Sequence, residues 1–418
     1  MLLKPLTLAL GPLLALPALA GFDEGMTAWQ HQDYATALKE WRPLAAQGNA
    51  AAQNGLGQLY ATGQGVEQDF GTALQWYGKA AKQGDANAQY NLGAMYSNGQ
   101  GVYQNPGLAE TWFGKAAAQG RADAQYGLGV LLAREQSPDM PQVLDWFRKA
   151  AAQGYAPAQY QMGLLTQSGL GLTRDPAQAA EWFRLAASQD LALAEHALAL
   201  LYLNGQGLAQ NDGLAVQWLA KAAEQGLPEA QNDLGSLYAL GRGVAWDDTQ
   251  AALWYRKAAD QGNAQAQYNL GVAYTRGLGV PWQNVQAAQW LYKSAGQGNA
   301  AAAEALGVLY DKGRGVAQND AQALVWYRQA AVLGNAQALA DLAGMYEQAR
   351  QLPYDLVLVH MLYTLADKAG NPKGAESLAR VARLLNPAQL AEAQALAAAW
   401  KPGQALPVSS RTGLSAGN

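Results

Sequence analysis

The chain has 418 residues with 28 basic and 32 acidic side chains, a formal net charge of −4 at neutral pH, and no cysteine. The lack of cysteine excludes disulfides and thiolate metal sites, and the slightly acidic balance argues against nucleic acid as a principal partner. The function must therefore depend on other side chains and on the fold that arranges them.

The N-terminal residues have the pattern of a secretory signal peptide. A single lysine precedes the apolar run 6–16 and the small residues 18–20. This pattern predicts cleavage near Ala20-Gly21 and a periplasmic or secreted location, in agreement with a disulfide-free envelope protein. No later segment reaches the roughly 20 apolar residues that a spanning helix requires, and no cysteine follows the cleavage site, so we expect neither a membrane span nor a lipid anchor.

Residues 21–49 follow, and with Gly25, Tyr34, Ala37 and Trp41 they resemble a divergent tetratricopeptide-type helical hairpin. Beyond them, tryptophan recurs at intervals of 36 residues, with one interval of 34, at Trp76, Trp112, Trp146, Trp182, Trp218, Trp254, Trp290 and Trp326. A fixed period of this length indicates units that cannot bury their own apolar faces and must stack on their neighbours. Nine such units tile residues 50–371, and function must be sought on the surface of the array.

Each unit predicts two helices, which we name helix A and helix B. Helix B has apolar residues at helical spacing, for example at Ala73, Trp76, Tyr77, Ala80 and Ala81. Helix A has a similar stripe but also contains a recurring glycine, which implies a close backbone approach because glycine disfavours helices by about 1 kcal/mol. A Gly-x-Gly loop suits positive φ between the helices, and an Asp or Asn before helix B matches an N-cap.

The units resemble the Sel-one-like repeat (SLR) family, relatives of the tetratricopeptide repeats. The resemblance rests on the recurring alanine, Leu-Gly, Gly-x-Gly and Trp-Tyr-x-Lys-Ala-Ala pattern over residues 50–371. It implies an all-α fold, a right-handed α/α solenoid of stacked antiparallel helix hairpins. The third unit, which has Pro138 and Pro141 in place of the loop glycines, and the ninth, which has Leu362 at the tryptophan position, are atypical. Residues 372–400 predict C-terminal capping helices, and 401–418 a disordered tail.

No catalytic or phosphate-binding motif is found, so we predict a non-enzyme without a cofactor or metal. His196 replaces a tyrosine of other units on helix A, and we favour packing over a ligand or base role. Asp247 and Asp248 stand where other units cap helix B, which favours capping over a metal or acid/base pair. A lysine recurs on helix B, and we favour solvated or locally paired lysines over a stripe that binds a polyanion. These lysines are Lys79, Lys115, Lys149, Lys221, Lys257 and Lys293.

The candidate partner-binding groove lies on helix A, by analogy with tetratricopeptide arrays. Its predicted residues are Tyr90, Asn91, Tyr126, Tyr160, His196, Tyr268, Asn269 and Arg276. Tyrosine suits recognition because it offers apolar area with one polar tip, although packing between hairpins explains the same tyrosines equally well. Glu304 on helix A and Tyr103 in a loop also break the internal pattern. Trp246 and Trp282 occupy equivalent loop positions and form a possible aromatic patch, with packing against the loop as the favoured alternative.

These features favour a non-enzymatic scaffold or adaptor of the bacterial cell envelope that binds a protein partner through helix A, a role that the SLR resemblance also implies. A regulator that restrains a peptidoglycan-processing enzyme is an alternative, since it differs only in what binding does. A cell-wall or β-lactam hydrolase is a further alternative, but the SLR proteins associated with that chemistry have cysteine-rich repeats, which this chain lacks.

Overall fold

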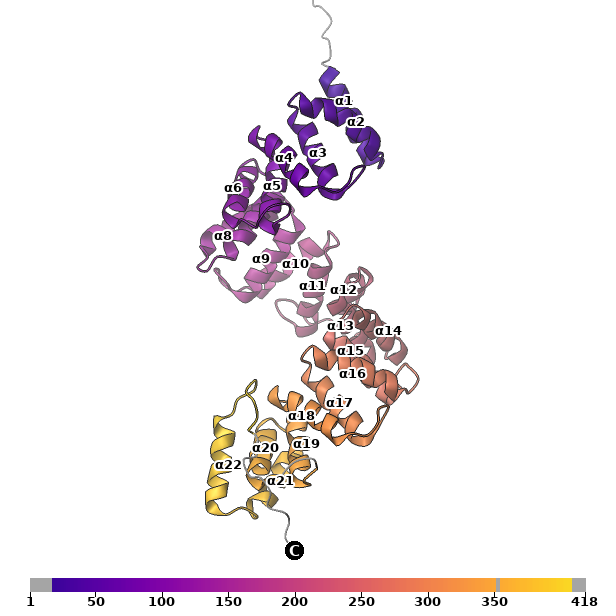
Figure 1. Cartoon of the computed structure of the whole chain (residues 1–418), viewed down its shortest axis with the longest axis vertical. Coiled ribbons are helices and arrows are strands. Elements are labelled where there is room, and N and C mark those ends of the chain that lie inside the picture. Colours follow the sequence, from indigo (N-terminus) through magenta and orange to yellow (C-terminus); the bar gives the residue numbers. More distant parts are fainter. Residues whose placement is uncertain (1–16, 351–353, 408–418) are drawn as a thin grey trace, which may run out of the picture. The chain divides into compact units, whose positions relative to one another are not determined.

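The computed structural model describes residues 17–350 and 354–407, and every regular element among them is an α-helix. The chain divides into two compact units, Met1–Leu191 and Ala192–Asn418. Within each unit, consecutive helices fold back on one another as hairpins and each packs on its neighbours in the chain (Figure 1). This arrangement confirms the predicted all-α solenoid of stacked antiparallel hairpins.

Unit 1 begins with a hairpin, α1 and α2, and continues with four repeats in which helix A precedes helix B. Its helices are α1 (Pro17–Gln30), α2 (Tyr34–Ala46), α3 (Ala50–Thr62), α4 (Phe70–Lys82), α5 (Ala86–Asn98), α6 (Pro106–Ala118), α7 (Ala122–Ala133), α8 (Met140–Ala152), α9 (Ala156–Ser168) and α10 (Pro176–Ala187). The predicted signal peptide lies outside the described residues except for 17–20, which begin α1.

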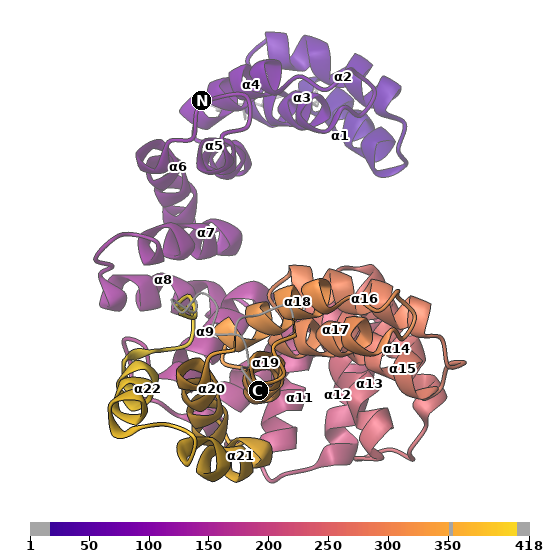
Figure 2. The ribbon, with the colours of Figure 1, turned by 60° about the horizontal axis from the view of Figure 1, so that its bottom comes forward.

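Unit 2 holds five further hairpins and two C-terminal helices. Its helices are α11 (Ala192–Asn204), α12 (Asp212–Glu224), α13 (Pro228–Leu240), α14 (Asp248–Asp260), α15 (Ala264–Arg276), α16 (Asn284–Gly296), α17 (Ala300–Lys312), α18 (Asp320–Val332), α19 (Ala336–Glu347), α20 (Leu356–Lys368), α21 (Pro372–Ala382) and α22 (Pro387–Ala399). Both α21 and α22 pack on α20, beside which they lie in Figure 2. None of the helices in the described part of the chain is long and apolar enough to span a bilayer.

Helix ends are set by side chains that recur with the repeat. Asp247 caps α14 by accepting a hydrogen bond from the Gln250 N–H at 3.0 Å, which supports the capping interpretation of this residue. Most helices A end at a glycine in the left-handed region, such as Gly277 with φ 70°. The second loop glycine serves another purpose: a Cβ on Gly279 would lie 1.9 Å from the Asp248 carbonyl oxygen, so the loop sits against the preceding helix B.

The recurring glycine of helix A accommodates a side chain of helix B in the same repeat. In unit 1, a Cβ on Gly163 would lie 2.4 Å from the ring of Phe183, and one on Gly93 would lie 2.7 Å from the ring of Phe113. The expected close approach is therefore present, but a ring rather than a backbone makes it. Unit 2 shows one alternative, where Ala199 and Leu219 occupy the corresponding positions in one core cluster.

Buried glutamines link the helices of each unit. Gln53 donates to the Ala45 carbonyl at 3.0 Å and accepts from Gln83 at 2.7 Å. In unit 2, Gln231 makes the equivalent bonds to Ala223 and Gln261. Since an unmade buried hydrogen bond costs about 1–3 kcal/mol, these glutamines belong to the frame rather than to a binding surface.

The start of the expected disordered tail is ordered. The Gly403 N–H donates to the Val332 carbonyl at 2.7 Å, and Leu406 is buried in the core cluster of unit 2. The prediction of disorder from Lys401 onward is therefore wrong for residues 401–407, because an apolar side chain in this segment packs into the core of unit 2. Residues 408–418 lie outside the described residues.

Candidate functional site

Two adjacent positions on each helix A, such as Tyr90 and Asn91 on α5, form a row of side chains along the repeats. Several polar side chains of this row form hydrogen bonds with the adjacent repeat. Asn91 donates to Asn54 at 3.0 Å in unit 1, and Asn269 donates to Asn232 at 2.9 Å in unit 2. His196 Nε2 lies 2.9 Å from the Asp233 carboxylate. This bond gives His196 a role in linking repeats, which agrees with the favoured packing interpretation.

The candidate tyrosines of unit 1 are half-buried against rings of their own repeats. Tyr126 packs on Phe147 with ring centroids 5.7 Å apart, and its other neighbour is Tyr155 at 5.5 Å. Tyr90 packs on Phe113 and Tyr160 on Phe183 in the same way. Burial raises the pKa of each of these tyrosines. Because each also retains some exposed surface, a part in partner binding stays a prediction.

Unit 2 brings three of the predicted site residues together. Tyr268, Arg276 and Trp282 line one hollow of about 650 Å³ between α15 and α17. We call it the arginine hollow; its other lining residues are Val272, Thr275, Asn284, Glu304, Ala305, Val308, Leu309 and Arg314. It therefore combines two guanidinium groups, two large aromatic side chains and an apolar floor. Its volume lies within the roughly 300–1,000 Å³ usual for ligand sites.

The carboxylate of this hollow is electrostatically unusual. Burial and, to a smaller degree, the nearby Asp341 carboxylate together raise the pKa of Glu304 from its usual 4.5 to about 7. Burial also raises the pKa of Asp341. Charged carboxylates are disfavoured where water is partly excluded, so Glu304 is protonated in a substantial fraction of molecules at neutral pH. The hollow is then dominated by its two arginines.

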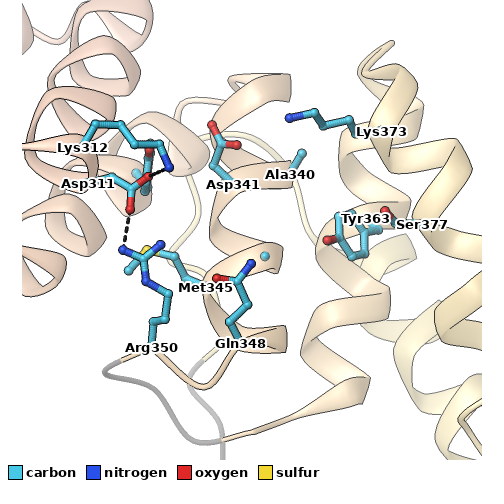
Figure 3. A pocket seen from close by; sticks show the side chains of 12 residues that line it. Asp311, Lys312, Ala340, Asp341, Met345, Gln348, Arg350, Tyr363, Lys373 and Ser377 are labelled. Carbon is cyan, nitrogen blue, oxygen red and sulfur yellow. Dashed lines mark hydrogen bonds and ion pairs between the residues drawn. The ribbon is translucent and has the colours of Figure 1, made fainter.

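A second hollow, of about 310 Å³, is lined in part by Asp341 and is shown in Figure 3. Lys312 and Arg350 both reach toward Asp311, and the Lys312 ammonium lies 2.7 Å from that carboxylate. Asp341 comes from α19 and Lys373 from α21. Because its cations and carboxylates largely pair with one another, this hollow offers less unpaired charge than the arginine hollow.

The loop tryptophans are exposed rather than packed. Trp246 is 67 % exposed and Trp282 is 68 % exposed, while Tyr103 in unit 1 is 98 % exposed. The favoured interpretation of Trp246 and Trp282 as loop packing is therefore wrong. The reason is geometric, since the Cβ atoms of these residues lie over the capping glycines Gly241 and Gly277 and their rings project away. Trp282 lines the arginine hollow, whereas Trp246 is not among its lining residues.

The helix B lysines are stacked on the tryptophans three residues earlier. The Lys79 ammonium lies 4.1 Å from the centre of the Trp76 ring, and Lys257 lies 3.8 Å from Trp254. The same pairing occurs at Lys115, Lys149, Lys221 and Lys293. Local pairing of these lysines is thus confirmed, through cation–π contacts.

Sequence reasoning missed Arg314. It stands between two loop glycines, where several units have glutamine, and so looks like ordinary loop variation. The available signal lies in the preceding repeat, where Asn284 begins helix B at the position at which Asp212, Asp248 and Asp320 begin theirs. Among the described residues, no group of three or more His, Asp or Glu side chains is placed to hold a metal ion.

Hairpins of two antiparallel helices that stack in series, with capping glycines and buried inter-helix bonds, define a repeat protein of the tetratricopeptide-like α/α class. The Sel1 repeat matches this chain eight times, at residues 50–85, 86–120, 122–155, 156–191, 192–227, 228–263, 264–299 and 300–335. Since these matches span more than half of its length, the chain belongs to the Sel1 repeat family. The predicted ninth repeat, α19 and α20, follows the last matched residue.

Two solved structures are similar over most of their lengths. One is c5321 of uropathogenic Escherichia coli, described as a protective antigen with an SLR fold, at 29% identity over 96% of this chain and 97% of that chain, with a TM-score of 0.57. The other is a Sel1 repeat protein from Oxalobacter formigenes, at 32% identity over 84% of this chain and 98% of that chain, also with a TM-score of 0.57. No curated protein matches the chain. Sel1 repeat arrays typically serve as protein-interaction scaffolds.

Proposed function

We propose that this protein is a non-enzymatic adaptor of the bacterial cell envelope that binds a protein partner through the helix A surface of unit 2. The observation that carries the proposal is the arginine hollow, where Tyr268, Arg276, Trp282 and Glu304 meet. Each of these side chains except Tyr268 departs from the repeat pattern, so the frame does not require them. Rigid stacked hairpins would present the hollow with little ordering cost on binding.

An envelope location is supported by the signal-like pattern of residues 1–20 and by the similarity to a protective antigen of Escherichia coli. Cells that produce the full chain are expected to yield a periplasmic or secreted form that begins near Gly21. Mass spectrometry of the purified protein would measure its N-terminus. An intact N-terminus on cytoplasmic protein would contradict the location.

Site-specific photo-crosslinking in cells tests the binding surface directly. A benzophenone amino acid at Val308 would lie in the arginine hollow, and the same group at Val325, which is 54 % exposed on α18, is the matched control. We expect a discrete crosslinked partner from Val308 but not from Val325. Equal products from both positions would place binding elsewhere, and no product from Val308 would argue against an adaptor that uses this surface.

The same surface would serve a regulator of a peptidoglycan-processing enzyme, because the two roles differ in what binding does to the partner. Identification of the Val308 product by mass spectrometry separates them. A cell-wall enzyme whose turnover falls when the purified chain is added would favour the regulator, and an unchanged rate would favour the adaptor.

A further inference from the structure

Arginines in the interhelical loops of unit 2 are normally neutralised within the array. Arg242 binds Asp212, the first residue of α12, through two hydrogen bonds of 2.8 Å, and it also donates to the Leu203 carbonyl. Arg350 pairs in the same way with Asp320, the first residue of α18. In each case the carboxylate lies 30 residues before the arginine and begins the preceding helix B. Such bidentate pairs leave little charge for a ligand.

Arg314 occupies the loop position of Arg242 but lacks this carboxylate. The residue that begins the preceding helix B is Asn284, and the loop sits directly on it, since a Cβ on Gly315 would lie 2.3 Å from the Asn284 carbonyl carbon. An amide side chain is neutral and cannot cancel the guanidinium charge. Within residues 17–350 and 354–407, no carboxylate pairs with Arg314 or with Arg276, the last residue of α15.

Both of these unpaired cations line the arginine hollow, and both are exposed. Trp282 also lines it, with 68 % of its surface exposed. Exposed tryptophan and arginine are the residue types most enriched at interface hot spots. Among the described residues, Glu304 is the only one with a carboxyl group that lines the hollow.

We propose that the arginine hollow binds an acidic peptide segment of the partner, with carboxylate side chains against Arg276 and Arg314 and an aromatic or apolar neighbour against Trp282. This inference rests on the proposed adaptor function and specifies the chemistry of the partner. Arginine favours planar carboxylates because its fixed donors match them, and water is already partly excluded at this site. Arg314 is left without a carboxylate partner because residue 284 is asparagine, where the helices that pair with Arg242 and Arg350 begin with aspartate.

Selection from a random twelve-residue peptide library displayed on phage tests the inference with the full chain as bait. Peptides recovered on the wild type are expected to be enriched in Asp and Glu beside an aromatic residue. The R276Q/R314Q variant is expected to lose this enrichment. The matched control is R148Q/R383Q, which removes the same charge at two exposed arginines outside the hollow and is expected to retain the enrichment.

A second variant alters the charge without touching either arginine. Asn284→Asp would give Arg314 the partner that Arg242 and Arg350 already have. By fluorescence anisotropy with a labelled selected peptide, we expect Kd to rise about tenfold in N284D and further in R276Q/R314Q, because a charge-assisted bond is lost. A control peptide with Gln in place of Glu should bind weakly, with the same Kd for the wild type and for both variants. Circular dichroism checks that helicity is unchanged.

The outcomes distinguish this inference from the adaptor proposal. Selected peptides without acidic enrichment, or an acidic enrichment that survives in R276Q/R314Q, would overturn the inference while the interaction function stands. Recovery of no peptide above background would count against both. Unchanged Kd in N284D would also overturn the inference, since it would show that the charge of Arg314 does not matter to binding.

Discussion

The helix A rows of the two units differ in chemistry although their frames are alike. In unit 1, Tyr90, Tyr126 and Tyr160 each rest on a phenylalanine of the same repeat. In unit 2, the corresponding rows contain His196, which bonds to Asp233, and Glu304, which is half-buried near Asp341. The same tyrosine–phenylalanine contact thus recurs in three consecutive repeats of unit 1, whereas the corresponding residue in unit 2 changes from repeat to repeat.

This difference separates the residues that every repeat needs in order to fold from the residues that are available to serve a partner. A frame residue recurs because every hairpin must close in the same way, as the glycine–ring pairs of unit 1 do. A residue that serves a partner has no reason to recur in every repeat. Arg276 and Glu304 do not recur, and Trp282 has one equivalent, Trp246. Function is therefore best sought where the pattern fails on an accessible helix A surface, which is the arginine hollow of unit 2.

The largest effect is expected from a change that breaks the frame of unit 1. Gly163→Ala places a methyl group 2.4 Å from the buried ring of Phe183 and should lower the free energy of unfolding by about 1–3 kcal/mol through overpacking. Unit 2 tolerates alanine at this position with Leu219 opposite Ala199. Phe183→Leu should therefore cost less in the G163A background than in the wild type, as a double-mutant cycle in urea would measure.

Gly78→Ala is the control for that experiment. Gly78 lies on α4, and a Cβ there would meet nothing within 4 Å, so alanine should be neutral or stabilising by up to about 1 kcal/mol. If G163A proved as stable as G78A, the ring contact would not be the reason for glycine on helix A.

Much of this frame is predictable from the sequence because it repeats. The tryptophan period, the Asp247 cap and the capping glycine at residue 277 each have local causes that recur, so each position is tested several times within one chain. The site is less predictable. Arg314 is unpaired because residue 284, 30 residues earlier, is Asn, whereas Arg242 and Arg350 have Asp212 and Asp320 at the same separation. This pairing is visible only when the loops are seen against the preceding helices.

The exposure of Trp282 is likewise not predictable from the sequence, because it depends on the direction in which one loop side chain leaves the backbone. The order of residues 401–407 depends on the packing of Leu406 in the core of unit 2 and on the hydrogen bond from Gly403 to Val332. The ordered segment has no internal copy for comparison, and Trp282 has only one, Trp246, which is exposed in the same way. Prediction was strongest where the chain repeats itself and weakest where it does not.

A smaller effect, specific to unit 2, is expected from pH. The folded pKa of Glu304, about 7, lies above its usual 4.5, so the folded state binds a proton more tightly than the unfolded state. Stability should therefore be greatest below pH 4.5 for this group and fall as pH rises toward and through 7. Because Glu304 is partly exposed, we expect a loss on the order of 1 kcal/mol between pH 5.5 and 8, from urea unfolding at each pH.

Glu304→Gln mimics the protonated form and should flatten this dependence by raising stability at pH 8. Asp341 contributes in the same direction and would leave a residual slope, because burial raises its pKa as well. An E304Q protein that loses as much stability as the wild type between pH 5.5 and 8 would show that Glu304 titrates near its ordinary value. Glu304 would then no longer mark an electrostatic difference between the two units.

The smallest effect concerns a feature that both units share. Lys79 and Lys82 both lie in the last turn of α4, so each interacts with the helix dipole, but only Lys79 is known to stack on Trp76, at 4.1 Å. Lys79→Gln should lower the free energy of unfolding by about 0.5–1 kcal/mol more than Lys82→Gln, the value of an exposed cation–π contact. Thermal unfolding of the two variants measures this difference. Equal stabilities would show that the stacking contact does not stabilise the fold. Weaker binding of the selected acidic peptide to K79Q would show that Lys79 belongs to the partner surface rather than to the frame. We expect peptide binding to be unchanged, because this lysine is already paired with the tryptophan that it covers, whereas the arginines of the hollow have no carboxylate partner among the described residues.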